Sequence, residues 1–405
     1  MTDHSINPPC PGDWRRSGFL KTDAIAQTLA ELIRINSVNP SYGGPEGGED
    51  RLGRWIADFL AGRGLHAHPH AVAPGRNNLV VTLPGRTERP GMLFETHLDT
   101  VSIEDMSVAP LGARIHAGRI FGRGATDAKA QIAALLHALA ALAETGPPSR
   151  PVHVAFVVDE EFAMAGSAAL ASQLDFEPAG IAVAEPTNLN VVTTHKGTVR
   201  WWIDFRGRAA HSSRPHLGVN AIAGAARLIH KIEESYTTEL AARTAPLLDP
   251  PTLNVARIQG GVQANLVPPS CRVELERRTI PGETPESVQG EVQHLIAGVL
   301  NEMPELNIEQ QRPSFAASAL CTDAESAPAR TALRIAARIG RSEQPLGVAY
   351  ATDAAQLVRM GRPIIVVGPG SIEQAHTADE FAELEEVTAG ARYFAEFMAT
   401  FGGES

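Results

Sequence analysis

The chain has few cysteines and no cysteine pattern. Cys10, Cys271 and Cys321 are odd in number and far apart, so they predict neither a disulfide framework nor a CxxC metal site. A chain of 405 residues can bury a sizeable core without such cross-links. We therefore expect a folded protein with reduced thiols, and the cytoplasm is the expected location.

Long apolar runs are also missing. No run reaches the ~18 residues that a membrane-spanning helix needs. Met1–Arg16 lacks the apolar core of a secretory signal. The sequence thus predicts neither a membrane protein nor a secreted one, and it gives the opening segment no role.

Positive charge is scarce and scattered. Lys and Arg number 35 against 46 Asp and Glu, which gives a formal net charge of −11. A phosphate backbone repels such a field and no basic patch offsets it, so we expect no nucleic-acid partner. The hydrophobic share of 43% and the length are typical of a globular protein with two or three domains.

Helix and strand patterns alternate in the first half of the chain. Short apolar runs suited to buried strands lie between helical stretches: strands at 78–82, 91–95, 152–158 and 181–184, and helices at 22–35, 50–63 and 127–144. The same pattern returns near the end, with helices at 328–339 and 384–401 around a strand at 363–367. This alternation favours an α/β domain with a mostly parallel sheet.

The middle of the chain has a different order. From about His195 the patterns run β-α-β-β-α-β, which is the ferredoxin-like unit. We therefore expect a small α+β domain of residues 195–314, inserted into an α/β domain formed by residues 1–194 and 315–405.

Two groups of polar residues follow the early strands. His97 and Asp99 point the same way on a strand, where a carboxylate can orient a metal-binding histidine, although a structural histidine is the alternative. Asp127 begins a long helix after a glycine-rich turn, and an ordinary N-cap is the alternative for it.

Three further groups lie after later strands. Asp159, Glu160 and Glu161 form a run of carboxylates that a cation would make favourable, and a solvated loop is the alternative. Glu185 begins a strand-end turn, and His376 lies in a loop before the last helix. For both of these residues an ordinary loop position is the alternative.

Taken together, these residues point to one site. Ligands of open α/β sheets bind beyond the carboxyl ends of the strands, where most of these residues fall. Two histidines and three carboxylates suit two zinc-like ions bridged by one carboxylate. A spare glutamate remains as a possible general base.

The motifs in their order resemble the di-metal M20 metallopeptidase and deacylase family that includes acetylornithine deacetylase and succinyl-diaminopimelate desuccinylase. The resemblance runs from about Leu20 to Phe401 and rests on Thr96–Asp99, Gly122–Lys129, Asp159–Glu161, Glu185–Thr187, His195–Gly197 and Gly368–His376. It implies a Zn-peptidase-like hydrolase domain with a lid domain that also forms a homodimer.

The resemblance also implies roles for the polar residues. His97 and Glu185 would bind one metal ion and Glu161 and His376 the other, and Asp127 would bridge them. Asp99 would orient His97, and Glu160 would act as general base. A cis peptide bond is expected after the bridging aspartate. Zinc is the expected metal, with cobalt or manganese as alternatives.

Substrate contacts are expected from the lid and the last motif. His211 resembles the family's oxyanion-stabilising lid histidine, and Gly370 lies in the last motif. Asn265 and Arg278 look like substrate contacts. For Arg278 the reason is that arginine binds a carboxylate in bidentate fashion, and a surface ion pair is the alternative. For Asn265 the alternative is an ordinary turn residue. His66, His68 and His70 alternate around Pro69, which favours an exposed edge strand over a metal clip.

These expectations favour a hydrolase that cleaves the amide of a small N-acyl amino acid carrying a carboxylate. The local match around 368–379 leans toward acetylornithine deacetylase. A dipeptidase or carboxypeptidase, a hydrolase of another C–N bond in a small catabolic acid, and a metal-binding protein without turnover remain alternatives. The intact Glu160 argues against the last of these.

Overall fold

The computed structural model describes residues 13–403. Cys10 and most of the opening segment therefore lie outside the described residues. The chain divides into two compact units. Unit 1 takes in the residues up to Thr193, Thr322–Leu346 and the residues from Thr352 on, and unit 2 takes in Thr194–Cys321 and Gly347–Ala351. Unit 2 thus extends beyond the expected end at 314 and includes a short later segment that the sequence did not indicate.

Unit 1 is built on a mixed sheet. Its strands run in the order β1-β2-β6-β3-β7-β16-β8, with bounds Ala67–Ala73, Arg76–Leu83, Val152–Val157, Met92–His97, Gly180–Val183, Ile364–Val366 and Val192–His195. β14 (Leu320–Cys321) pairs with Thr194 and His195 at the end of β8, and these residues are counted in unit 2. The pairings β6-β3, β3-β7 and β7-β16 are parallel. The β1-β2, β2-β6 and β16-β8 pairings are antiparallel. The parallel core thus consists of four strands with antiparallel strands at both edges.

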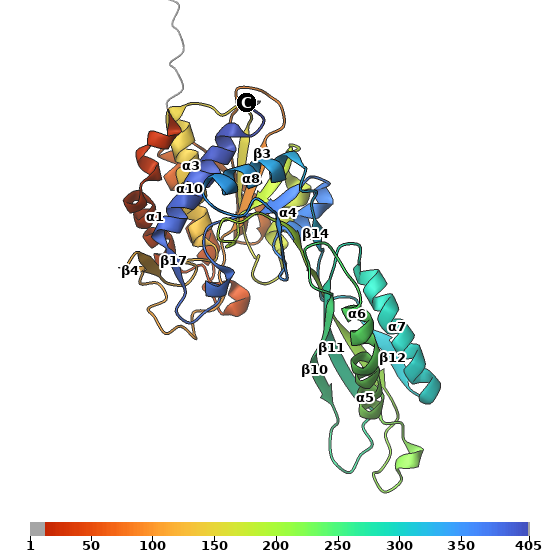
Figure 1. Ribbon diagram of the computed structural model, residues 1–405. Helices are drawn as coiled ribbons and strands as arrows, with labels where there is room; N and C mark the ends of the chain where they lie inside the picture. The colour runs from red at the N-terminus through yellow and green to blue at the C-terminus, as the bar shows by residue number, and fades with distance from the viewer. Residues whose placement is uncertain (1–12, 404–405) are drawn as a thin grey trace, which may run out of the picture. The chain divides into compact units, whose positions relative to one another are not determined.

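The helices of unit 1 cover both faces of this sheet. On one face α1, α3 and α10 lie side by side (Figure 1), and α2 and α8 pack beside them; their bounds are Thr22–Arg34, Lys129–Thr145, Leu384–Thr400, Gly48–Ala61 and Ala327–Arg338. On the other face α4 (Ala165–Gln173) packs against α9 (Ala354–Leu357). The helix α3 is rich in Ala and Leu and buried on all sides, which is why it lacks the one-sided pattern of a surface helix.

A small separate sheet completes unit 1. It has the order β17-β5-β4, with bounds Phe381–Glu383, Arg119–Phe121 and Arg114–His116. β5 precedes the glycine-rich turn at 122–124, and β17 follows His376. This sheet therefore holds two site-bearing loops that are far apart in the sequence.

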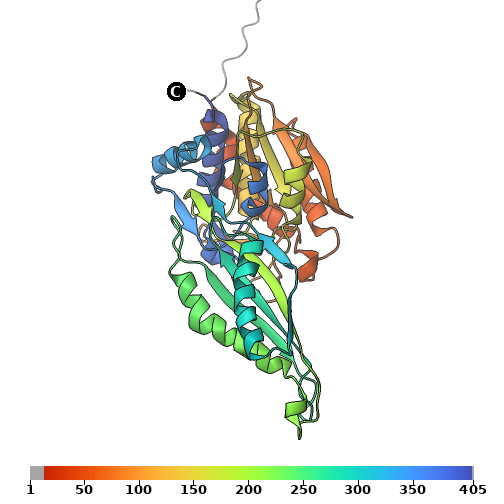
Figure 2. The same cartoon turned by 90° about the vertical axis from the view of Figure 1, so that its right-hand side faces the viewer.

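Unit 2 has the expected ferredoxin-like order. Its antiparallel sheet runs β10-β11-β9-β12, and its helices are α5 and α7; the bounds are Thr252–Gly260, Ser270–Thr279, Gly197–Arg206, Asn307–Gln310, Ala221–Lys231 and Pro285–Glu302. Both helices lie on one face of the sheet (Figures 1 and 2) over a core around Trp201. A π-helical turn at Ile232–Tyr236 and α6 (Thr237–Ala241) extend α5, and β13 (Phe315–Ala317) pairs with β9.

No helix among residues 13–403 is long and apolar enough to span a membrane.

Candidate active site

Five predicted metal ligands meet at one edge of the parallel core of unit 1. His97 ends β3, Glu161 follows β6, Glu185 follows β7 and His376 follows β16. Asp127 lies directly before α3. Parallel strands bring their carboxyl ends to the same edge, so residues far apart in sequence converge there.

Asp127 lies between the two histidines. Its Oδ1 is 3.0 Å from Nε2 of His97, and its Oδ2 is 3.4 Å from Nε2 of His376. Each carboxylate oxygen thus faces a different imidazole. This is the arrangement that a carboxylate bridging two cations requires.

The other two carboxylates divide between the histidines. Glu185 Oε1 lies 3.9 Å from Nε2 of His97, and Glu161 Oε2 lies 3.0 Å from Nε2 of His376. Ligand atoms of His97, Asp127 and Glu161 all lie within 4.8 Å of one another. Nε2 of His97 therefore faces Asp127 and Glu185, and Nε2 of His376 faces Asp127 and Glu161.

Asp99 is fully buried behind His97. Nδ1 of His97 is 3.0 Å from the Asp99 backbone oxygen and 3.6 Å from its Oδ1. The backbone N–H groups of Glu160 and Glu161 donate to the Asp99 carboxylate at 3.0 and 3.2 Å. Asp99 thus contacts both the histidine and the turn that carries Glu160.

The turn before Asp127 is held by a buried glutamate. The carboxylate of Glu380 accepts hydrogen bonds from the backbone N–H groups of Gly124, Thr126 and Asp127 at 2.9–3.1 Å. It also pairs with Arg123 at 2.9 Å. The peptide bond between Asp127 and Ala128 is cis, as the family resemblance implies. Asp127 is not an N-cap, because α3 begins only at Lys129.

Neighbouring carboxylates raise the pKa values of both histidines of the site. Burial alone would lower the pKa of His97, but its hydrogen bonds to Asp127 and Asp99 raise that pKa well above its usual value. Hydrogen bonds to Asp127 and Glu161 raise the pKa of His376 to about 10. In both cases, nearby negative charge favours the protonated imidazole and so raises its pKa.

The crowding of negative charge also changes the pKa values of the carboxylates. Burial raises the pKa of Glu161 to about 7, and burial together with neighbouring carboxylates raises the pKa values of Glu160 and Glu185 well above the usual range. The hydrogen bonds from His376 and His97 outweigh burial at Asp127 and lower its pKa.

These residues fit two divalent cations. Imidazole nitrogens and carboxylate oxygens are ligands that zinc, cobalt and manganese accept in proteins. Bound cations would supply the positive charge that stabilises these crowded carboxylates. The site is also accessible, because the His376 side chain is 52% exposed.

The predicted lid residues lie in unit 2. His211 is exposed, and Ser213 N–H donates to its Nδ1 at 3.1 Å. The loop of Asn265 lies beside it, since the Asn265 backbone oxygen accepts from Ser212 N–H at 2.9 Å. Arg278 donates to Glu276 and to Thr198 at 2.9 and 3.0 Å. The structure thus brings His211 and Asn265 together and gives Arg278 an ion-pair partner.

Gly370 lies in unit 1 with a positive φ of +90°. A Cβ added there would lie 3.0 Å from the Thr126 hydroxyl, next to Asp127. The position therefore favours glycine close to the site.

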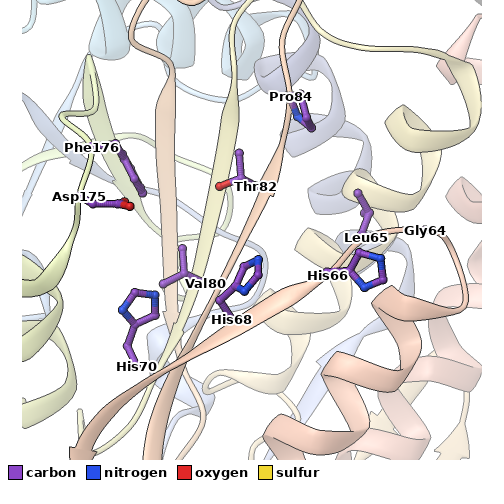
Figure 3. Close-up of a pocket in the computed structure, with 10 residues that line it drawn as sticks. All are labelled: Gly64, Leu65, His66, His68, His70, Val80, Thr82, Pro84, Asp175 and Phe176. Carbon is purple, nitrogen blue, oxygen red and sulfur yellow. The ribbon is translucent and has the colours of Figure 1, made fainter.

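The alternating histidines lie away from this site. β1, which carries His68 and His70, is the edge strand of the sheet, as the sequence indicates. Figure 3 shows His66, His68 and His70 along a hollow of about 590 Å³ that Asp175 and Phe176 also line. Among residues 13–403, the one group of three ligand residues whose ligand atoms all lie within 4.8 Å of one another is His97, Asp127 and Glu161, at the site described above and not among these histidines.

Several residues that support the site were not predicted. They are Glu380, Asn39, Glu49 and Arg76. Asn39 donates to both Asp99 and Asp159 at 2.7 and 2.9 Å. Hydrogen bonds across such distances in the sequence leave no local signal.

Several solved structures share this fold. The fold matches a tripeptidase from Staphylococcus aureus subsp. aureus Mu50 with a TM-score of 0.77 at 21% identity, over 96% of this chain and 100% of that one. It also matches a dinuclear metal-binding M20 peptidase from Bacillus subtilis with a TM-score of 0.70 at 15% identity, over 93% and 97%. A hydantoinase/carbamoylase-family amidase from Burkholderia multivorans matches with a TM-score of 0.63 at 14% identity, over 98% and 100%.

The sequence itself matches one family over residues 93–400, a range that holds all five candidate metal ligands and Glu160. The chain therefore belongs to peptidase family M20/M25/M40 and is a metal-dependent hydrolase that acts on C–N bonds.

Proposed function

We propose that the chain hydrolyses the amide bond of small N-acyl amino acids, in the manner of acetylornithine deacetylase. The observation that carries this proposal is the position of Asp127, whose two oxygens face His97 and His376 separately. A pair of bridged cations at this place suits hydrolysis of an amide by an activated water.

The metal ligands divide as the contacts divide. His97 and Glu185 would hold one ion, Glu161 and His376 the other, and Asp127 both. Zinc is the proposed metal, with cobalt or manganese as alternatives. When bound, the ions would polarise the substrate carbonyl and lower the pKa of a water molecule.

Glu160 is the proposed general base. Its backbone N–H donates to the Asp99 carboxylate, and so does that of Glu161, so one carboxylate holds the turn that carries both side chains. Burial raises its pKa well above the usual range, which favours transfer of a proton to it from water. It would take a proton from the attacking water and pass it to the leaving amine. The products are a carboxylic acid and an amine.

Substrate contacts complete the proposal. His211 would stabilise the oxyanion, as the family resemblance implies. Asn265 and Gly370 would contact the substrate, and Arg278 would bind its carboxylate. The same resemblance supports a homodimer formed through the inserted domain. We place the enzyme in the cytoplasm, where the free thiols of Cys271 and Cys321 would stay reduced.

Peptide hydrolysis is the second candidate. The family name itself denotes peptidases, and the similar solved structures include a tripeptidase. The metals and Glu160 would act in the same way on a peptide bond. The size and polarity of the accepted substrate distinguish the two candidates.

Amine release from a substrate panel tests the proposal. Metal-free protein is loaded with zinc or cobalt and supplied with N-acetyl, N-succinyl and N-formyl amino acids and with dipeptides. We expect turnover of N-acyl amino acids that falls by about 10²–10⁴-fold in Glu160→Gln. Glu31→Gln is the matched control, because Glu31 is exposed on α1 and pairs with Arg34 there. Turnover confined to dipeptides would favour the second candidate, and no turnover with two ions bound would refute both.

A further inference from the structure

The turn that carries Glu160 and Glu161 begins in an unfavourable backbone conformation. Asp159 has a φ of +69°, in the left-handed region that non-glycine residues rarely adopt. Such a conformation persists only where surrounding contacts fix it. The contacts of Asp159 therefore decide where the next two side chains point.

An ion pair from two other elements holds Asp159. Arg76, at the start of β2, places its Nη1 2.9 Å from Asp159 Oδ1. Glu49, in the first turn of α2, accepts from the Asp159 backbone N–H at 2.9 Å. Arg76 also donates to both carboxylate oxygens of Glu49, at 2.5 and 2.8 Å. Asp159 is thus held at its backbone and at its side chain by one Arg–Glu pair.

Asn39 continues this arrangement toward the metal ligands. Its amide nitrogen donates to Asp159 Oδ1 at 2.9 Å and to Asp99 Oδ2 at 2.7 Å. Asp99 in turn accepts from the backbone N–H groups of Glu160 and Glu161. The turn is therefore fixed on both sides, by Arg76 and Glu49 at its start and by Asp99 along its length.

The pair lies outside the ligand set. Arg76 forms ion pairs with Glu49 and Asp159. Both acidic partners are almost fully buried, so their carboxylates need a fixed cation nearby. The forked guanidinium of arginine serves two carboxylates at once, which the single ammonium of lysine cannot do with the same geometry.

We propose that Arg76 is a positioning residue, which through Glu49 and Asp159 fixes the turn that presents Glu160 and Glu161. The inference rests on the proposed function for the roles of these two glutamates. In this role Arg76 itself contacts neither substrate nor metal.

Two conservative variants test this proposal, and each changes only one property of the ion pair. Arg76→Lys keeps the charge but loses the fork. Asp159→Asn keeps the size and the tolerance of left-handed backbone but loses the charge that faces Arg76. The control is Arg34→Ala, which removes an exposed Arg–Glu pair of α1 in unit 1 with Nη1 and Oε1 3.4 Å apart.

The expected result is a selective loss. Supporting residues behind metal ligands typically contribute 10–100-fold in metal affinity or activity. We expect zinc affinity to fall about 10–100-fold in both variants and kcat to fall similarly, with KM within about twofold of wild type. Amide hydrogen exchange at Glu160 and Glu161 should rise at least about tenfold. Arg34→Ala should match wild type in all these measurements.

Zinc titration and hydrogen exchange need no substrate, so they test Arg76 even if the proposed reaction is wrong. Wild-type zinc affinity and wild-type exchange in both variants would overturn the proposal. A rise in KM with unchanged kcat and unchanged zinc affinity would overturn it as well, because that result would assign Arg76 to substrate binding.

Discussion

Replacement of Asp99 by asparagine should be costly although it changes only one atom. Asp99 Oδ2 accepts from Asn39 Nδ2 at 2.7 Å and from the Glu161 N–H at 3.2 Å. Its Oδ1 accepts from the Glu160 N–H at 3.0 Å. Each carboxylate oxygen therefore accepts from at least one N–H group. An asparagine would place its NH₂ group where one of these oxygens lies, so that two donors would face each other.

The size of the effect follows from these contacts. One buried donor left unpaired costs about 1–3 kcal/mol, and loss of the negative charge weakens the remaining bonds by about 1 kcal/mol. We therefore expect Asp99→Asn to lower the free energy of unfolding of unit 1 by about 2–4 kcal/mol. Zinc affinity should fall about 10–100-fold, because the orientation of His97 and the turn of Glu160 both depend on this carboxylate.

Calorimetric unfolding of the metal-free protein and zinc titration measure the two effects separately. Asp204→Asn is a matched control, because Asp204 is a partly exposed carboxylate of unit 2 that pairs with Arg272 at 3.4 Å. A loss below about 0.5 kcal/mol with unchanged zinc affinity would refute the role that the contacts give to Asp99.

Three further predictions concern stability. Burial lowers the pKa of His137 to about 4, so the unfolded chain binds more protons below pH 6.5, and stability is lost as the pH falls toward 4. This term amounts to about 2 kcal/mol at pH 5, and urea unfolding of His137→Gln should show a correspondingly weaker loss between pH 7 and pH 5. An unchanged pH dependence would contradict it. Phe94→Ala should lower the unfolding free energy by about 3–5 kcal/mol in the same assay, because Phe94 is fully buried between the rings of Phe394 and Phe397; a cost below 1 kcal/mol would be inconsistent with that packing. Chelation of bound metal should lower Tm, and added zinc should restore it; a Tm insensitive to both would count against a metal-stabilised site.

The strand-end ligands could be predicted from the sequence because two local signals coincide there. Buried parallel strands such as 152–157 appear as short apolar runs, and their carboxyl ends share one edge. A polar residue directly after such a run, like Glu161 or Glu185, therefore lies close to the others. The sequence predicts this convergence without any knowledge of side-chain contacts.

The supporting contacts could not be predicted in the same way. Glu380 accepts from Asp127 N–H across more than 250 positions, and Arg76 reaches Asp159 across more than 80. Neither residue type stands out in its local pattern. Only the pairing of β5 with β17, and of β2 with β6, brings them together.

The limits of the inserted unit illustrate the same point. β13 (Phe315–Ala317) lies beyond the expected end at 314, but it adds to the same sheet by pairing with β9. The later segment 347–351 joins unit 2 as well, and Lys196 N–H donates to the Val348 backbone oxygen at 3.1 Å. Such pairings depend on partners more than 100 positions away, which hydrophobic periodicity does not report.

Metal content per chain tests the central claim most directly. We would titrate the metal-free protein with zinc and count bound ions by elemental analysis, for wild type and for Asp127→Ala. Because Asp127 faces both histidines, the account predicts two ions per wild-type chain and loss of both at micromolar zinc in the variant. One ion in the wild type, or two retained in the variant, would contradict the bridged two-metal site.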